Sequence, residues 1–92
     1  MRRVSIFGAT GSIGCNTVAL LQAQGGAEAH DVVVLTGARN AGLLARQALA
    51  LRARRAVVAD AAHLPELRAA LAGSGILAEG GREAILAAAD AT

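Results

Sequence analysis

The amino-acid sequence predicts an α/β fold, and three observations support this prediction. Short apolar or β-branched runs alternate along the chain with longer segments of helical periodicity. Glycine clusters end several of these segments. Apolar residues make up 54% of the 92 residues but only one is aromatic, so the core must be packed from small aliphatic side chains. Strands that alternate with helices favour parallel pairing, so we expect a partial Rossmann-type, doubly wound parallel sheet with the order β-α-β-α-β-α-β-α.

The first strand is predicted over Val4–Phe7, and as a parallel strand it is expected to be buried on both faces. A helix is predicted from about Ser12 to Gln24, ending at the glycine pair that follows. The residues expected on its apolar face share helical spacing: Ile13, Thr17, Leu20, Leu21 and Gln24.

The β-branched run Asp31–Leu35 predicts the second strand, and the five residues after it are expected to form a loop. A second helix is predicted from about Ala41 to Arg52, with Asn40 as its N-cap. Its expected buried face consists of Leu44, Ala48 and Leu51.

The third strand is predicted over Ala56–Ala59, and Asp60 is expected to cap or precede the third helix. Pro65 suits the first turn of that helix, whose apolar stripe would be Leu67, Ala70 and Leu71. Beyond a glycine-rich break, a short strand over Ile76–Ala78 and a helix over Arg82–Ala89 complete the prediction.

Three glycines follow the first strand at a regular spacing: Gly8, Gly11 and Gly14. The first allows a sharp turn, the second lets a phosphate approach the backbone, and the third lets the helix pack closely against the sheet. The helix N-terminus then offers unpaired N–H groups and a positive dipole end, which predicts a dinucleotide site. A connection that is glycine-rich for turn geometry alone is the alternative, but it explains only Gly8.

The loop after the second strand indicates which dinucleotide is bound. Sites for NAD usually place an acidic residue here, whereas Thr36–Asn40 contains none. Arg39 offers a fork of donors suited to the 2′-phosphate of NADPH, although a solvated loop arginine is the alternative. Asn40 can cap the next helix while its backbone faces the phosphate.

Charge and composition argue against several other classes of function. All nine basic residues are arginine and the net charge is only +2, so nucleic-acid binding is not predicted. The one dense cluster, Arg52, Arg54 and Arg55, is interpreted as cations that complement a helix C-terminus. No apolar run approaches the ~18 residues needed to span a bilayer, so no membrane association is expected.

Further residues carry no predicted chemistry. The single cysteine, Cys15, is interpreted as structural and fits a reducing compartment, and no signal peptide is seen, so a cytoplasmic location is expected. His30 and His63 lie in polar stretches and are too isolated for a metal site. Asp60 is interpreted as a cap rather than a catalytic acid. Three further acids are expected to be solvated or to complement helix dipoles: Glu79, Glu83 and Asp90.

Four segments together resemble the N-terminal part of the 1-deoxy-D-xylulose 5-phosphate reductoisomerase family: Gly8–Thr17, Arg39–Asn40, Leu43–Leu51 and Ala56–Asp60. The resemblance covers nearly all of this chain but only the opening part of such an enzyme. The family commonly has Ala-Gly-Lys-Asn or similar where this chain has Gly37-Ala38-Arg39-Asn40, so the basic residue and the asparagine persist while the small pair is reordered.

The resemblance implies an NADPH-dependent oxidoreductase of the non-mevalonate isoprenoid pathway. Such an enzyme rearranges and reduces 1-deoxy-D-xylulose 5-phosphate, a phosphosugar, to 2-C-methyl-D-erythritol 4-phosphate with a divalent metal, Mg or Mn. Residues 1–92 would be the N-terminal part of its NADPH-binding Rossmann domain, without the catalytic and C-terminal domains. Metal ligands and catalytic residues are expected beyond Thr92, so the chain alone is expected to be inactive, and the full-length enzyme is expected to be a homodimer. The cofactor contacts carried over are Thr10, Gly11, Ser12, Ile13, Ala38, Arg39 and Asn40.

Two other interpretations stay open. An atypical short-chain-reductase-like protein can share the glycine turn and a basic residue after the second strand, with catalytic tyrosine and lysine further along; this chain contains neither residue type. A non-catalytic nucleotide-sensing module would bind the cofactor and a partner surface, for which the arginine cluster is the only indication.

Overall fold

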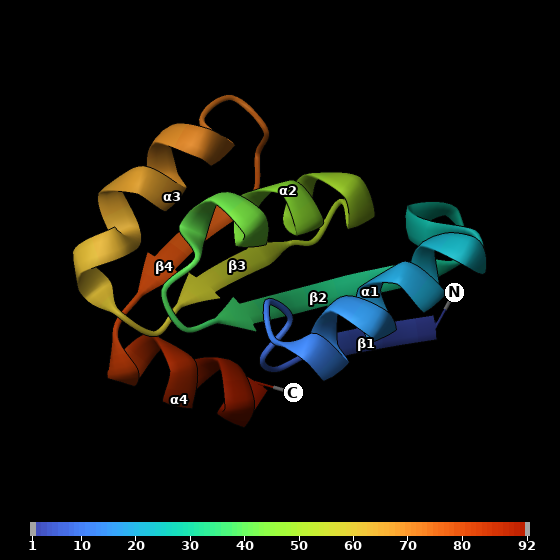
Figure 1. The fold of residues 1–92 in the computed structure, drawn as a ribbon, viewed down its shortest axis with the longest axis horizontal. Coiled ribbons are helices and arrows are strands. Elements are labelled where there is room, and N and C mark those ends of the chain that lie inside the picture. The colour runs from blue at the N-terminus through green and yellow to red at the C-terminus, as the bar shows by residue number, and fades with distance from the viewer. Residues whose placement is uncertain (1, 92) are drawn as a thin grey trace.

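The computed structural model describes residues 2–91, which form a four-stranded parallel sheet flanked by helices (Figure 1). The strands are β1 (Arg2–Ile6), β2 (His30–Gly37), β3 (Arg55–Val58) and β4 (Leu77–Gly80). The helices are α1 (Ser12–Ala23), α2 (Ala41–Leu51), α3 (Leu64–Leu71) and α4 (Arg82–Ala91), with 3₁₀ turns η1 (Gly26–Glu28) and η2 (Ala61–His63). Every predicted strand and helix is confirmed, with small differences at the ends; for example, β2 continues through Gly37 into the expected loop.

The sheet has the strand order β1-β2-β3-β4, and every neighbouring pair is parallel. Helices α1, α2 and α3 pack on one face, where their side chains share the main core with Ala56 and Val58. Helix α4 covers the opposite face, where Ala88 packs on Val34 and Val57. Helices therefore lie on both faces, as the prediction of a doubly wound sheet requires.

The prediction that the first strand is buried on both faces is wrong for the part of the chain that the structure describes. Of the predicted strand only Ile6 is buried, whereas Val4 and Ser5 are half-buried and Phe7 is exposed. The reason lies in the strand order, which places β1 at an edge with β2 as its only neighbour among residues 2–91. An edge strand leaves one row of backbone groups unpaired, a feature that strand order and not local sequence decides.

The predicted apolar face of α1 is partly wrong. Ile13 and Leu20 are exposed, while Gly14, Val18 and Leu21 form the buried side. The helix has two apolar faces of similar character. The face that contains Gly14 is the buried one, because a glycine is needed where the helix contacts the turn. In α2 the prediction is confirmed, because all three expected core residues are fully buried: Leu44, Ala48 and Leu51.

The predicted helix-start signals are confirmed. The Asn40 side chain accepts a hydrogen bond from the Leu43 N–H at 3.1 Å and caps α2. The Asp60 carboxylate accepts from the Ala62 N–H at 3.0 Å and so caps the η2 turn that leads into α3. Pro65 lies in the first turn of α3.

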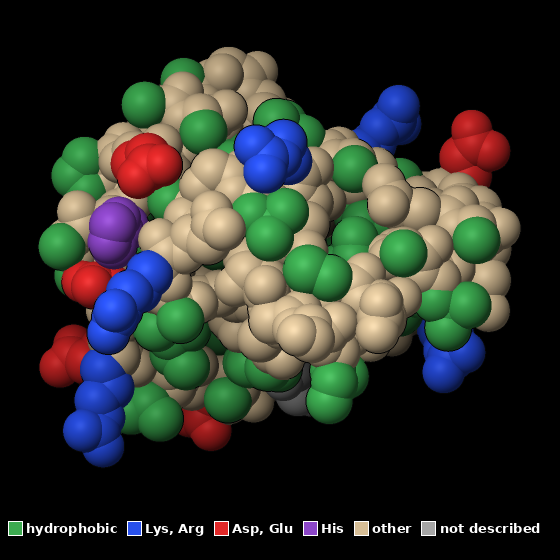
Figure 2. All heavy atoms as spheres, in the orientation of Figure 1, with side chains coloured by type: hydrophobic (Ala, Val, Ile, Leu, Met, Phe, Trp, Pro, Cys, Tyr) green, Lys and Arg blue, Asp and Glu red, His purple; other side chains and the backbone are tan. Residues whose placement is uncertain are grey.

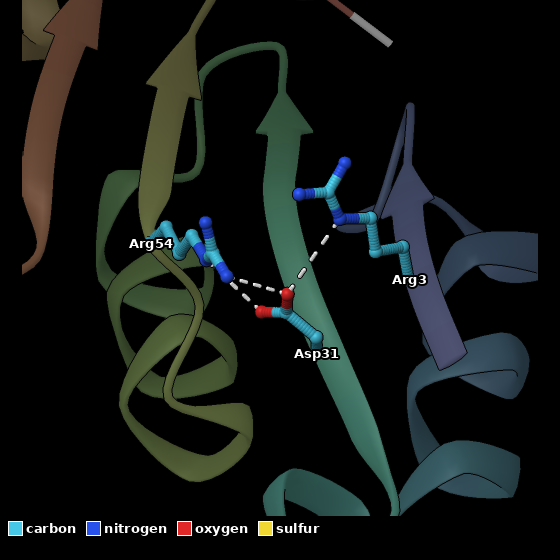
Figure 3. A network of polar contacts seen from close by, with 3 residues as sticks. All are labelled: Arg3, Asp31 and Arg54. Carbon is cyan, nitrogen blue, oxygen red and sulfur yellow. Dashed lines mark hydrogen bonds and ion pairs between the residues drawn. The ribbon is translucent and has the colours of Figure 1, made fainter. Parts of the chain in front are cut away.

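The arginine cluster does not serve as a group at a helix end. Arg52 is the exposed C-cap of α2, in a left-handed conformation with φ 50°. Arg54 instead forms a two-point ion pair with Asp31, and Arg3 approaches the same carboxylate from β1 at 3.9 Å (Figure 3). Arg55 pairs with Glu79 across β3 and β4, which corrects the prediction that this glutamate is solvated or complements a helix dipole.

His30 was expected in a polar stretch but is buried at the start of β2, with 8% of its surface exposed. Neither ring nitrogen has a hydrogen-bond partner among residues 2–91. His30 lies opposite Arg2 in the register of β1 and β2, and its burial depends on the folded chain, so local composition does not reveal it.

Candidate dinucleotide-binding site

The glycine-rich turn connects the carboxyl end of β1 to the start of α1. Gly8 adopts φ +79°, a conformation that favours glycine, and its carbonyl accepts from the Gly11 N–H at 3.1 Å. The Cys15 N–H to Gly11 carbonyl contact, at 2.8 Å, makes the first turn of the helix. No side chain caps this helix at Gly11. The N–H groups of its first turn are therefore available to an anion.

Gly14 allows the turn and the helix to touch. A Cβ atom at Gly14 would lie 2.0 Å from the Gly8 carbonyl oxygen and 2.6 Å from the Ala9 Cα. The close approach is thus to the turn itself, and not primarily to the sheet as the sequence suggested. At Gly11 a Cβ would meet only the Gly8 oxygen, at 3.5 Å, so the outer side of the turn is open.

The second part of the site is the loop after β2, and backbone hydrogen bonds fix it. The Ala59 N–H donates to the Gly37 carbonyl at 2.7 Å, and the Asp60 N–H donates to the Ala38 carbonyl at 2.9 Å. Ala38, Arg39 and Asn40 are all exposed. No carboxylate among residues 2–91 forms an ion pair with the Arg39 guanidinium, so the expected cationic position is available to an anionic ligand.

Direct hydrogen bonds join the two loops. The Gly8 N–H donates to the Thr36 hydroxyl at 2.9 Å, and the Ala9 N–H donates to the Thr36 carbonyl at 2.7 Å. A Cβ at Gly37 would lie 3.0 Å from the Thr10 side chain, which therefore rests against the end of β2. All seven predicted contact residues consequently lie at the carboxyl edge of the sheet, where ligands of open α/β sheets bind.

Two residues that hold this site together were not found from the sequence. Thr36 is buried at the end of β2, and Gln47 is buried on α2 with its amide nitrogen 2.8 Å from the Ala9 carbonyl oxygen. A polar residue at the end of an otherwise apolar strand is a readable signal for Thr36. Gln47 gives a weaker one, a polar residue on the apolar side of a predicted helix.

An open hollow of about 510 Å³ lies beside the glycine-rich turn. Its lining combines the turn with the ends of β1 and α1: Ile6, Phe7, Gly8, Gly11, Ser12, Ile13, Gly14 and Thr17. Ile13 is 84% exposed here, which fits a role in contacting a ligand better than a role in the core. A concave surface that joins free backbone donors to exposed apolar side chains suits a ligand with both phosphate and ring groups.

Charge is distributed unevenly around the site. Figure 2 shows charged side chains gathered at the left of this face, over α3 and the start of α4, whereas the region over α1 is mostly uncharged. Within residues 2–91 no three His, Cys, Asp or Glu side chains gather where they could hold a metal ion. In the same part of the chain no helix is both long and apolar enough to cross a membrane.

The comparisons with known proteins agree on one family. The family model for 1-deoxy-D-xylulose 5-phosphate reductoisomerase matches residues 4–92. A reductoisomerase of that name from Jannaschia sp. (strain CCS1) is 58% identical over 89 residues, which are 97% of this chain and 22% of the relative. One from Cereibacter sphaeroides (strain ATCC 17025 / ATH 2.4.3) is 56% identical over 90 residues, 98% of this chain and 23% of the relative. The chain thus spans under a quarter of the relatives' length.

Two solved structures with similar folds are also reductoisomerases. The reductoisomerase from Zymomonas mobilis in complex with NADPH superposes with a TM-score of 0.90 at 41% identity, over 96% of this chain and 23% of that one. A second reductoisomerase, in complex with magnesium, gives a TM-score of 0.78 at 22% identity, over 94% and 21% of the two chains, and so supports the fold alone.

Proposed function

Because the chain belongs to the 1-deoxy-D-xylulose 5-phosphate reductoisomerase family, we propose that it forms the NADPH-binding part of such an enzyme. One observation supports this most directly: the uncapped N-terminus of α1 and Arg39, which forms no ion pair within residues 2–91, lie at the ends of two adjacent parallel strands. A dinucleotide has two separated groups of negative charge, and the chain offers one set of donors to each.

In this proposal the pyrophosphate is held by the turn and the first backbone N–H groups of α1, at Thr10, Gly11, Ser12 and Ile13. The 2′-phosphate is held by the second loop, at Ala38, Arg39 and Asn40. Arg39 donates to the phosphate, while Asn40 caps α2 and so keeps the loop in place. Without an acidic residue at the end of β2, NADPH would be preferred over NADH.

NADPH, when bound, supplies the hydride for reduction of the rearranged phosphosugar. The chain contributes binding and orientation of that cofactor to the conversion of 1-deoxy-D-xylulose 5-phosphate to 2-C-methyl-D-erythritol 4-phosphate. The divalent metal of the family does not fit residues 2–91, since no ligand cluster is present there. Metal and substrate would therefore be held by residues outside this part of the protein, and no catalytic residue is assigned here.

Residues 1–92 are accordingly proposed as the N-terminal part of the NADPH-binding domain. A homodimeric full-length enzyme in the cytoplasm is proposed with it, in keeping with the single cysteine. The comparisons do not favour a short-chain-reductase-like protein or a nucleotide-sensing module.

Calorimetric titration of the purified chain with NADPH and NADH tests the proposal. Saturable binding of NADPH, with NADH weaker by roughly tenfold or more, is the expected result, because only NADPH carries the phosphate that Arg39 contacts. Equal affinity for the two nucleotides would contradict the assignment of the second loop. The purified chain is also expected to show no NADPH oxidation with the phosphosugar, and measurable turnover would contradict the absence of catalytic residues.

A further inference from the structure

Gln47 is a buried polar residue on the core side of α2, with 7% of its surface exposed. Its helix neighbours on that side are apolar: Leu44, Ala48 and Leu51. The amide nitrogen donates to the Ala9 carbonyl at 2.8 Å, across a sequence separation of 38 residues. This hydrogen bond joins helix α2 to the glycine-rich turn. An apolar side chain could fill the same space in the core, so packing alone does not explain the glutamine.

The amide is costly to bury, which makes its contact informative. The Gln47 Oε1 atom is buried and has no hydrogen-bond partner among residues 2–91. A buried acceptor without a partner is destabilising, and an apolar side chain of similar length would avoid that cost. The gain from a glutamine here therefore lies on its donor side, toward Ala9 and toward the Cys15 sulfur at 3.6 Å.

Ala9 is the point where the turn is held from several directions. It is fully buried, and its N–H donates to the Thr36 carbonyl at 2.7 Å while its carbonyl accepts from Gln47. The next residue, Thr10, has its carbonyl 3.6 Å from the Cys15 sulfur, which is itself in contact with Gln47. A shift of Gln47 would therefore be transmitted to the segment that precedes Gly11.

The same helix carries the second phosphate position. Asn40 caps α2 seven residues before Gln47, which corresponds to about 10 Å along a helix axis. Since a helix of this length is stiff, the Gln47–Ala9 hydrogen bond adds a restraint from α2 on the separation between the glycine-rich turn and the loop that carries Arg39, beside the hydrogen bonds that join the turn to Thr36.

We propose that Gln47 is a positioning residue that couples the pyrophosphate and 2′-phosphate halves of the cofactor site by holding the Ala9 carbonyl against α2. The inference rests on the proposed function, because both halves are assigned there. Gln47 touches neither phosphate position itself, so its effect is on the distance between them.

The variant Gln47→Met tests this in the full polypeptide that the gene encodes, because it keeps the length of the side chain and removes the N–H donor. Two titrations are compared: NADPH, which spans both positions, and adenosine 2′-monophosphate, which reaches only the Arg39 side. The expected result is about tenfold weaker binding of NADPH with unchanged binding of the monophosphate. Leu49→Ala, an exposed change on the same helix, is the matched control and should alter neither titration.

Hydrogen exchange measured without any nucleotide gives an independent result. Peptides that cover residues 7–14 should exchange faster in Gln47→Met, while peptides that cover β2 and β3 should not change. If the unmodified protein bound neither nucleotide, the proposed function would fail, and selective exchange in the turn would still support the positioning role.

Three outcomes would overturn the inference. Unchanged NADPH affinity would show that the contact is dispensable, and unchanged exchange in the turn would show that Gln47 does not restrain it. Equal loss of affinity for both ligands, with faster exchange throughout, would indicate a general effect on stability. Should Gln47→Met fail to fold, Gln47→Asn keeps a buried amide but withdraws it from Ala9, and the same criteria apply.

Discussion

The two ends of the parallel sheet use charge and hydrogen bonding in opposite ways. At the amino end Asp31 receives two hydrogen bonds from Arg54 and a longer contact from Arg3, so opposite charges are matched within the chain (Figure 3). At the carboxyl end the first turn of α1 has no side-chain cap, and Arg39 has no ion pair among residues 2–91.

This difference between matched and unmatched charges indicates which end of the sheet is suited to binding a ligand. Matched charges contribute modestly to stability and leave nothing for a ligand to complete. Unmatched donors at the ends of adjacent strands are compatible with folding because they remain in contact with water, and they become strong contacts when an anion replaces that water. The nine arginines therefore differ in their capacity to bind a ligand. Their ion-pair partners in the fold indicate this capacity better than their spacing in the sequence does.

The largest effect is expected from Gly14→Ala at the carboxyl end. The new methyl group would meet the Gly8 oxygen and the Ala9 Cα well inside contact distance, so the turn must move. We expect the free energy of unfolding to fall by about 3 kcal/mol, measured by urea denaturation, together with loss of NADPH binding. Gly42→Ala is the matched control, because a Cβ there meets Glu66 only at 3.8 Å; it should be neutral or stabilising by up to about 1 kcal/mol. Equal losses in the two variants would remove the special role of Gly14.

The next largest effect is expected from Arg39→Asp. A charge-assisted contact would be replaced by repulsion, so NADPH binding should weaken by about 1–3 kcal/mol while NADH binding changes little. Calorimetry with both nucleotides measures this. An unchanged NADPH affinity would exclude Arg39 from the site and weaken the contrast between the two ends of the sheet.

A smaller effect is expected from Asp31→Asn at the amino end. The variant removes the charge shared by Arg54 and Arg3, and since Arg3 and Arg54 are largely exposed, the loss of stability should be about 1 kcal/mol or less. Thermal unfolding should register it, with NADPH affinity unchanged. A clear loss of nucleotide binding would contradict the separation of roles between the two ends.

The smallest effect is expected from Arg52→Gly. Arg52 ends α2 with φ 50°, which glycine adopts without the steric cost that a Cβ carries. The variant should therefore gain about 0.5–1 kcal/mol of stability in urea denaturation. A loss of similar size would show that the arginine side chain makes a stabilising contact that outweighs its backbone strain.

The sequence determined much of this protein because its local signals agree with one another. Glycine spacing after an apolar strand, the caps at Asn40 and Asp60, and the core face of α2 are encoded within a few residues of where they act. The absence of an acid after β2 is equally local. These features predicted the element order and the two loops of the candidate site.

Only the tertiary structure decided which groups meet across long sequence separations. Within residues 2–91 the strand order leaves β1 at an edge of the sheet, His30 is buried at the start of β2, and Ile13 is exposed on α1. The tertiary structure also places two members of the arginine cluster in separate ion pairs, and it places Gln47 in contact with Ala9. Local sequence constrains the backbone of each segment, whereas contacts between segments depend on the relative placement of all of them, which no short pattern contains.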